Sequence, residues 1–98
     1  MNQGMLPPGV RPGFPLGQFA ITSEAFRKLE FRTVCEALAR HARCDWGDVS
    51  VSDATANAMA IAEGFRILSV YHDNYGVKFW IITEADRSAT TVLLPDDY

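Results

Sequence analysis

The stretch FRILSVYHDNYGVKFWIITEADRSATTVLL, residues 65–94, decides the fold, because apolar and polar side chains alternate along three of its segments. We expect strands at residues 65–72, 77–83 and 89–94. Each of the two connecting loops, 73–76 and 85–88, has four residues, and loops this short join antiparallel neighbours. The sequence therefore predicts a C-terminal β-meander with the middle strand at its centre.

Helix signals precede the meander. Thr22 or Ser23 would cap a short helix that runs to about Glu30, after a short strand at residues 18–22. Thr33 and Glu36 have the spacing of a capping box, which predicts a second helix from there to about Cys44. Ser52 would cap a third helix at residues 53–63, and Gly64 follows at the position of a C-terminal cap. We expect one α+β domain at residues 17–98, with three helices packed on one face of an antiparallel sheet of three to four strands.

Residues 1–16 are predicted to form a flexible arm. Residues 1–17 hold four of the five prolines and four of the seven glycines, which suit neither a helix nor a strand. The arm offers little apolar area, so we expect it to be dispensable for folding.

The composition excludes several classes of protein. Nine basic and twelve acidic residues give a net charge of −3, which argues against direct nucleic-acid binding. No apolar run approaches the roughly 18 residues of a membrane span, and the N-terminus lacks the pattern of a secretory signal. We therefore expect a cytoplasmic protein that does not enter a membrane. The two cysteines are too few for a disulfide scaffold.

The two faces of the predicted sheet follow from the loop lengths. If both hairpins are regular, Val70 lies opposite Phe79, and Phe79 lies opposite Leu94. The face toward the helices then holds Leu68, Val70, Phe79, Ile81, Val92 and Leu94. The other face holds Ile67, Ser69, Tyr71, Lys78, Trp80, Ile82, Thr91 and Leu93, and it is too apolar for a face meant for water. A one-residue slip would exchange these sets.

The second face is the candidate binding surface. We expect a contact surface made of Tyr71, Trp80, Ile82 and Leu93, with the loop residues Glu84, Asp86 and Arg87 at its rim. A protein partner or a second copy of the chain would bind there. The alternative is that the arm or the first helix covers this face.

Three groups of residues are candidates for chemistry. His41, Cys44 and Asp45 are close enough in sequence to share a metal, but they lack a second ligand pair, and His72 lies at a hairpin end. A Cys44–His41 nucleophile pair is disfavoured, because Asp45 and a helix C-terminus would raise the pKa of the thiol. Glu84 and Asp86 would suit acid–base work, although a structural turn explains them better. We expect no catalytic residue, metal or cofactor.

Several segments are similar to those of a known family: DWGD at residues 45–48, GFRILS at 64–69, KFWIITEADRS at 78–88 and TTVLLP at 90–95. They resemble a family of small proteins labelled plasmid-related, carried on bacterial plasmids and integrative elements, and the resemblance covers about residues 16–98. It implies a bacterial mobile-element setting and no mechanism.

That setting gives three functional hypotheses. The first is a non-enzymatic accessory protein that binds a host CRISPR or restriction complex stoichiometrically, as counter-defence proteins of the anti-CRISPR or anti-restriction type do. The second is a dimeric regulatory or maintenance module of a plasmid. The third is a small enzyme that uses the Glu84–Asp86–Arg87 loop.

Overall fold

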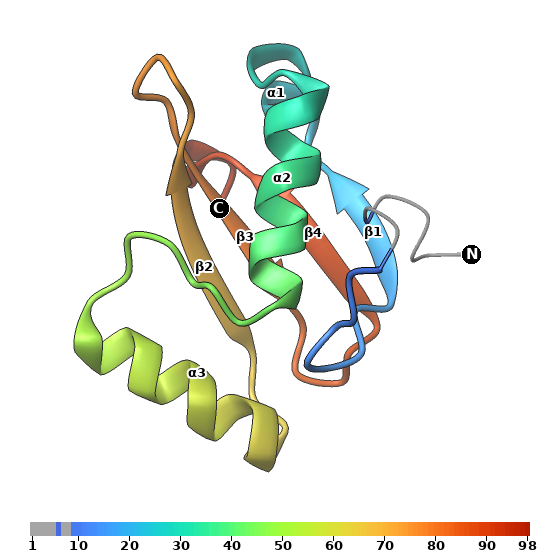
Figure 1. The fold of residues 1–98 in the computed structure, drawn as a ribbon. Coiled ribbons are helices and arrows are strands. Elements are labelled where there is room, and N and C mark those ends of the chain that lie inside the picture. Colours follow the sequence, from blue (N-terminus) through green and yellow to red (C-terminus); the bar gives the residue numbers. More distant parts are fainter. Residues whose placement is uncertain (1–5, 7–8) are drawn as a thin grey trace.

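A computed structural model of the chain describes residues 6 and 9–98, and in this part a four-stranded sheet carries three α-helices (Figure 1). The strands are β1 (Gln18–Ile21), β2 (Ile67–His72), β3 (Lys78–Thr83) and β4 (Ala89–Leu93), in the order β1-β4-β3-β2. β3 pairs antiparallel with β2 and β4, and β1 pairs parallel with β4. The predicted α+β class and the C-terminal meander are confirmed.

The helices are α1 (Ser23–Lys28), α2 (Phe31–Ala42) and α3 (Val51–Glu63), and a 3-10 turn, η2 (Pro95–Asp97), follows β4. Thr22 caps α1 as expected, because its hydroxyl accepts the Ala25 amide. The predicted capping box at Thr33 is wrong: the Val34 amide already bonds to the Glu30 carbonyl, so the first turn closes before Thr33 can act. Similarly, α3 is capped by Ser50 and not by Ser52.

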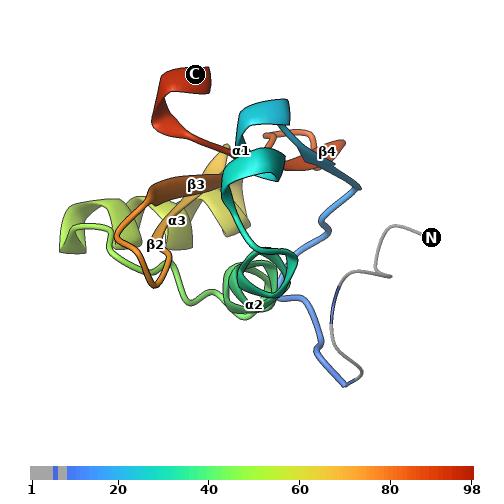
Figure 2. The ribbon, with the colours of Figure 1, turned by 90° about the horizontal axis from the view of Figure 1, so that it is seen from above.

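α2 lies across one face of the sheet, and the C-terminal end of the chain lies on the other side (Figure 2). The side chains that α2 turns toward the sheet pack with β3 and β4 in one buried cluster, which includes Val34, Leu38, Phe79, Ile81 and Val92. α3 flanks the outer edge of β2. The molecule therefore has a well-covered sheet face under α2 and a helix at the sheet edge.

The predicted register of β2 is wrong by one residue. Tyr71, not Val70, lies opposite Phe79, whereas the predicted β3–β4 register holds. The Asp73 amide donates to the Val77 carbonyl, so the loop shrinks to three residues and ends on Gly76, whose φ of 84° suits glycine. Because the loop has an odd number of residues, the two faces of β2 are exchanged relative to the prediction. Ile67, Ser69 and Tyr71 therefore face α2, and Leu68 and Val70 face away.

Part of the expected arm belongs to the core. Phe14 and Leu16 are buried with Ala42, Ala60 and Ile67 in a second cluster. The Gly13 amide donates to the Ala42 carbonyl at 2.8 Å, which joins the segment to the end of α2. The expected flexible arm is therefore wrong for residues 13–16, because two large apolar side chains are buried there. Residues 1–5 and 7–8 of the expected arm lie outside the described residues.

Candidate functional site

The predicted contact residues divide between the two faces of the sheet. Trp80 and Leu93 are direct neighbours across β3 and β4, and Ile82 lies on the same face. Tyr71 lies on the opposite face, where it is buried and its hydroxyl donates to the Asp45 carbonyl at 2.7 Å. Tyr71 is therefore part of the core under α2, which corrects its expected place beside Trp80. The cause is the odd β2–β3 loop.

The chain itself covers the face that holds Trp80. Ile82 and Leu93 are each only 5% exposed. The ring of Tyr98 packs edge-on against the Trp80 ring at 5.8 Å, and the Arg66 guanidinium donates to the Tyr98 hydroxyl. The Trp80 indole nitrogen is buried and has no hydrogen-bond partner among the described residues. The C-terminal end of the chain therefore covers part of this face.

The loop between β3 and β4 is held by contacts within the chain. Arg87 donates to the Ala60 carbonyl at 2.8 Å and to the Phe65 carbonyl at 2.7 Å, which ties the loop to the C-terminal end of α3. The Asp86 carboxylate accepts the Ser88 amide at 2.9 Å, and Glu84 pairs with Arg66 at 3.6 Å. The three expected rim residues thus shape the loop and anchor α3.

His41 lies at the centre of a buried polar network. Its Nδ1 is 2.6 Å from the Ser69 hydroxyl, and its Nε2 is 2.8 Å from the Thr83 hydroxyl. The rings of Phe14 and Trp46 pack around it at 5.3 and 5.8 Å. A serine next to a histidine is the geometry of a nucleophile and its base, but both side chains are 0% exposed. No substrate reaches this pair, and its role is structural.

The two cysteines do not take part in the hydrogen-bond network of His41. Cys44 follows the end of α2 in the left-handed conformation with a φ of 65°, and burial raises the pKa of its thiol. Burial, followed by the charge of Glu36, also raises the pKa of Cys35. Neither thiol is poised as a thiolate nucleophile. Within residues 6 and 9–98, no group of three or more histidine, cysteine or acidic side chains is arranged to hold a metal ion.

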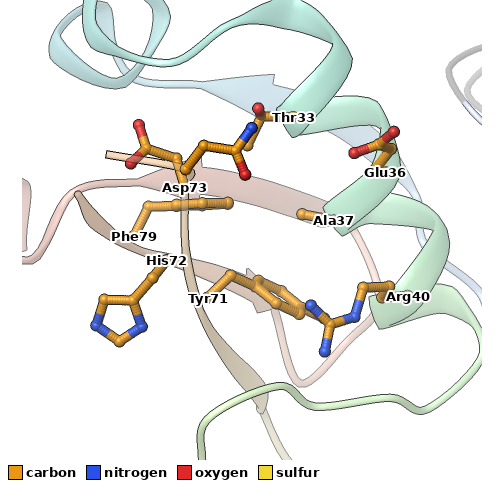
Figure 3. A pocket seen from close by; sticks show the side chains of 9 residues that line it. Thr33, Glu36, Ala37, Arg40, Tyr71, His72, Asp73 and Phe79 are labelled. Atoms are coloured by element: carbon orange, nitrogen blue, oxygen red, sulfur yellow. The ribbon is translucent and has the colours of Figure 1, made fainter. Parts of the chain in front are cut away.

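A cavity of about 190 Å³ opens between α2 and the hairpin of β2 and β3 (Figure 3). The α2 wall holds Thr33, Glu36, Ala37 and Arg40, and the sheet and hairpin supply Tyr71, His72, Asp73, Asn74 and Phe79. In Figure 3, Asp73 and Glu36 stand on opposite walls, with the rings of Tyr71 and Phe79 between them. The sequence did not reveal this cavity, because it depends on the turned-over register of β2.

α3 presents an uncharged outer face. Val51 is 86% exposed and Met59 is 57% exposed, and Phe65, just beyond the helix, is 56% exposed. Residues 54–62 contain no charged side chain, although only Asn57 and Ala60 of α3 are buried. Among the described residues, no helix is long and apolar enough to cross a membrane.

No family model, curated protein or solved structure matches this chain. The geometry of the α3 surface and of the cavity therefore supplies the functional argument. The signal for α3 was already present in the sequence, since a nine-residue helical run without a charge is unusual on a surface.

Proposed function

We propose that this chain is a non-enzymatic protein-binding protein of a bacterial mobile element, and that it acts by stoichiometric contact with a host CRISPR or restriction complex. The resemblance to plasmid-related proteins supports the setting. The observation that carries the binding role is the outer face of α3. We define this α3 outer face as Val51, Thr55, Ala58, Met59 and Ala62, all exposed.

The α3 outer face has the spacing of a docking helix. Its five residues recur at i, i+4, i+7, i+8 and i+11, so they form one stripe along the helix. Recognition helices that enter an apolar groove present such a stripe. Its only charged neighbours on α3 are Asp53 and Glu63, near the two ends. The surface thus has an apolar centre and an acidic rim, which suits a groove bordered by basic side chains.

α2 provides the contrast within the same molecule. Its exposed residues are Phe31, Arg32, Glu36 and Arg40, so three of the four carry a charge, as expected of a helix face in water. An α3 that stayed permanently in water would gain solubility from similar charges. Its apolar outer face is therefore best explained by a partner that covers it.

The test is a titration of the full chain against purified CRISPR and restriction complexes. Met59→Glu places a charge at the middle of the α3 outer face, and Phe31→Glu places the same charge on α2, at a residue that is 67% exposed. We expect one complex to be inhibited at equimolar protein. Met59→Glu should weaken binding about tenfold or more, as for a central interface residue, and Phe31→Glu should bind like the parent.

Sedimentation of the same three proteins separates the alternative of a dimeric plasmid module. A parent dimer that Met59→Glu dissociates would assign the α3 outer face to a second copy of the chain. Binding of a host complex that is equally strong for Met59→Glu and the parent would contradict the proposal.

A further inference from the structure

The two outer strands of the sheet, β1 and β2, differ at their free edges (Figure 1). At the β2 edge, the Asn57 side chain bonds to the backbone of Leu68. The backbone of Val70, further along the same edge, bonds to Trp46 and Asp48. Among the described residues, the β1 edge has no comparable contact. This difference carries an inference that is independent of the α3 outer face.

The register of β1 shows which of its backbone groups point away from the sheet. The Gln18 and Thr22 amides donate to carbonyls on the β4 side, each at 3.0 Å. In a parallel pair, alternate residues of a strand bond to the same neighbour, so Ala20, midway between them, also bonds to β4. The amides and carbonyls of Phe19 and Ile21 therefore point outward. Within the described part of the chain, none of these groups has a backbone partner.

An apolar cavity of about 110 Å³ opens beside this edge, between β1 and α2. It has room for one apolar side chain, since cavities of roughly 150 Å³ accommodate benzene. Its lining is entirely uncharged and consists of Phe19, Ala20, Ile21, Val34, Leu38 and Val92.

A strand added along β1 would reach this cavity. Phe19 and Ile21 pack against the core under α2, so Ala20, between them, points to the opposite face of the sheet. Every second side chain of an added strand would lie beside Phe19 and Ile21, on the face where the cavity opens. β1 also lacks the lysine or proline with which many edge strands prevent such pairing.

The size of the free edge indicates its occupant. A stable contact between two folded chains buries roughly 1,200–2,000 Å². Two residues of free backbone and space for one side chain provide much less, so the edge suits a short extended peptide better than a second copy of the chain. We propose that β1 binds an uncharged, extended segment of a partner protein as a fifth strand, and that an apolar side chain of this segment fills the cavity. The backbone hydrogen bonds supply the affinity, and the cavity selects the side chain.

The experiment is an NMR titration of the full chain with the peptide acetyl-Thr-Leu-Thr-Val-Thr-amide. We expect saturable shifts of the Phe19, Ile21 and Val34 signals with a Kd of about 1 mM. The Phe19 and Ile21 amides should also exchange more slowly when the peptide is bound. Acetyl-Thr-Asp-Thr-Asp-Thr-amide, which has no apolar side chain for the cavity, should not bind. Equal binding of the two peptides would overturn the proposal.

Two methylated peptides test the backbone pairing. One carries N-methyl groups on Leu and Val, and the other carries them on the three Thr residues. Only one edge of an added strand faces β1, so one methylated peptide should bind like the parent peptide and the other should not. Antiparallel pairing predicts the loss for methylated Leu and Val, because these residues then lie opposite Phe19 and Ile21. Equal binding by both methylated peptides would exclude strand addition.

Ile21→Lys and Ala20→Lys place the same charge on neighbouring residues whose side chains point to opposite faces. Ile21→Lys puts the charge beside the cavity and should raise the Kd about tenfold or more, whereas Ala20→Lys should change it by less than about twofold. Equal effects of the two variants would contradict the proposal. Thermal melting checks that both variants fold, and the methylated peptides test the parent chain independently of them.

The other possible occupants are recognised before any peptide is added. An open edge leaves the Phe19 and Ile21 amides in rapid hydrogen exchange. Protection that is the same at every concentration of the chain would assign the edge to residues 1–5. Protection that rises with concentration would assign it to a second copy. Either result would overturn the proposal and leave the α3 proposal untouched.

Discussion

The hydrogen bonds around His41 run in one direction because they end on the Leu16 carbonyl, which can only accept. The Thr90 hydroxyl donates to this carbonyl at 2.7 Å and therefore accepts from Thr83 at 2.8 Å. Thr83 must then accept from Nε2 of His41, which leaves Nδ1 to accept from Ser69. The network thus selects the neutral tautomer with its proton on Nε2. A second proton would have to bind at Nδ1 of His41, which already accepts the hydrogen bond from the Ser69 hydroxyl.

His41 makes stability depend on pH. Burial lowers its pKa from 6.5 to about 3, so between these values the unfolded chain takes up a proton that the folded chain does not. The free energy of unfolding should therefore be highest above pH 6.5. It should fall as the pH is lowered through 6.5, with a slope that approaches about 1.4 kcal/mol per pH unit once the histidine of the unfolded chain is fully protonated.

Denaturant unfolding at several pH values measures this slope, with His72→Asn as the control. This variant removes the second histidine of the chain, whose Nδ1 lies 2.8 Å from the Asp48 carboxylate, so the slope that it shows can be assigned to His41. A free energy of unfolding that stays flat from pH 6.5 to 5 would show that His41 is not held neutral. The sequence could place His41 on a helix, but not its partners, because Ser69 and Thr83 lie 28 and 42 residues away.

At the scale of elements, two separate sets of hydrogen bonds satisfy backbone groups at the outer edge of β2. The Asn57 side chain of α3 donates to the Leu68 carbonyl at 2.7 Å and accepts the Leu68 amide at 3.1 Å. Two residues further on, Val70 bonds to Trp46 and Asp48, beside Gly47. Edge strands with free amides and carbonyls invite pairing with other chains, and these contacts prevent it.

Asn57→Leu tests the first of these sets. The variant keeps an apolar side chain against β2 but leaves the Leu68 amide and carbonyl without their partner. We expect a loss of about 1–3 kcal/mol in the free energy of unfolding, together with faster hydrogen exchange of the Leu68 amide. Thr55→Ala, an exposed change on the same helix, should alter stability by less than about 0.5 kcal/mol. Unchanged exchange at Leu68 in the Asn57 variant would refute the role given to Asn57.

The strands and helices could be predicted because their periodicity is local, whereas the register of β2 could not. Both three-residue and four-residue loops are compatible with the letters DNYGV, and the choice depends on one backbone hydrogen bond between Asp73 and Val77. That bond decides which face Tyr71 occupies, and therefore which β2 side chains lie beside the cavity. The sequence thus predicted which residues lie on the strands, but not that Tyr71 and Trp80 lie on opposite faces of the sheet.

At the scale of the whole molecule, residues 13–16, just before β1, form part of the core. Phe14 packs on His41 and Trp46, so its removal opens a space beside the buried network. We expect Phe14→Ala to lower the free energy of unfolding by about 3–4 kcal/mol. A chain that begins at Leu16 should lose at least as much, as thermal melting would show. A melting temperature equal to that of the full chain would restore the view that the arm is dispensable.

Among the described residues, the α3 outer face is one of the apolar surfaces that the chain does not cover, and Phe26 on α1 and Phe31 on α2 are also exposed. The Trp80 face is covered by the C-terminal end, and a cavity opens beside the core under α2, between α2 and the β2–β3 hairpin. Of the exposed apolar side chains, Val51 and Met59 lie on one stripe of one helix, and Phe65 follows its end. This concentration is the basis of the central claim that α3 docks onto another protein.

Site-specific photo-crosslinking in the bacterial host tests that claim most directly. A photoreactive phenylalanine analogue replaces Met59 in one protein and Phe31, comparably exposed on α2, in another. We predict a single discrete adduct from position 59, whose mass identifies a host complex subunit or a second copy of the chain, and no adduct from position 31. Adducts from position 31 alone, or from both positions alike, would contradict the account.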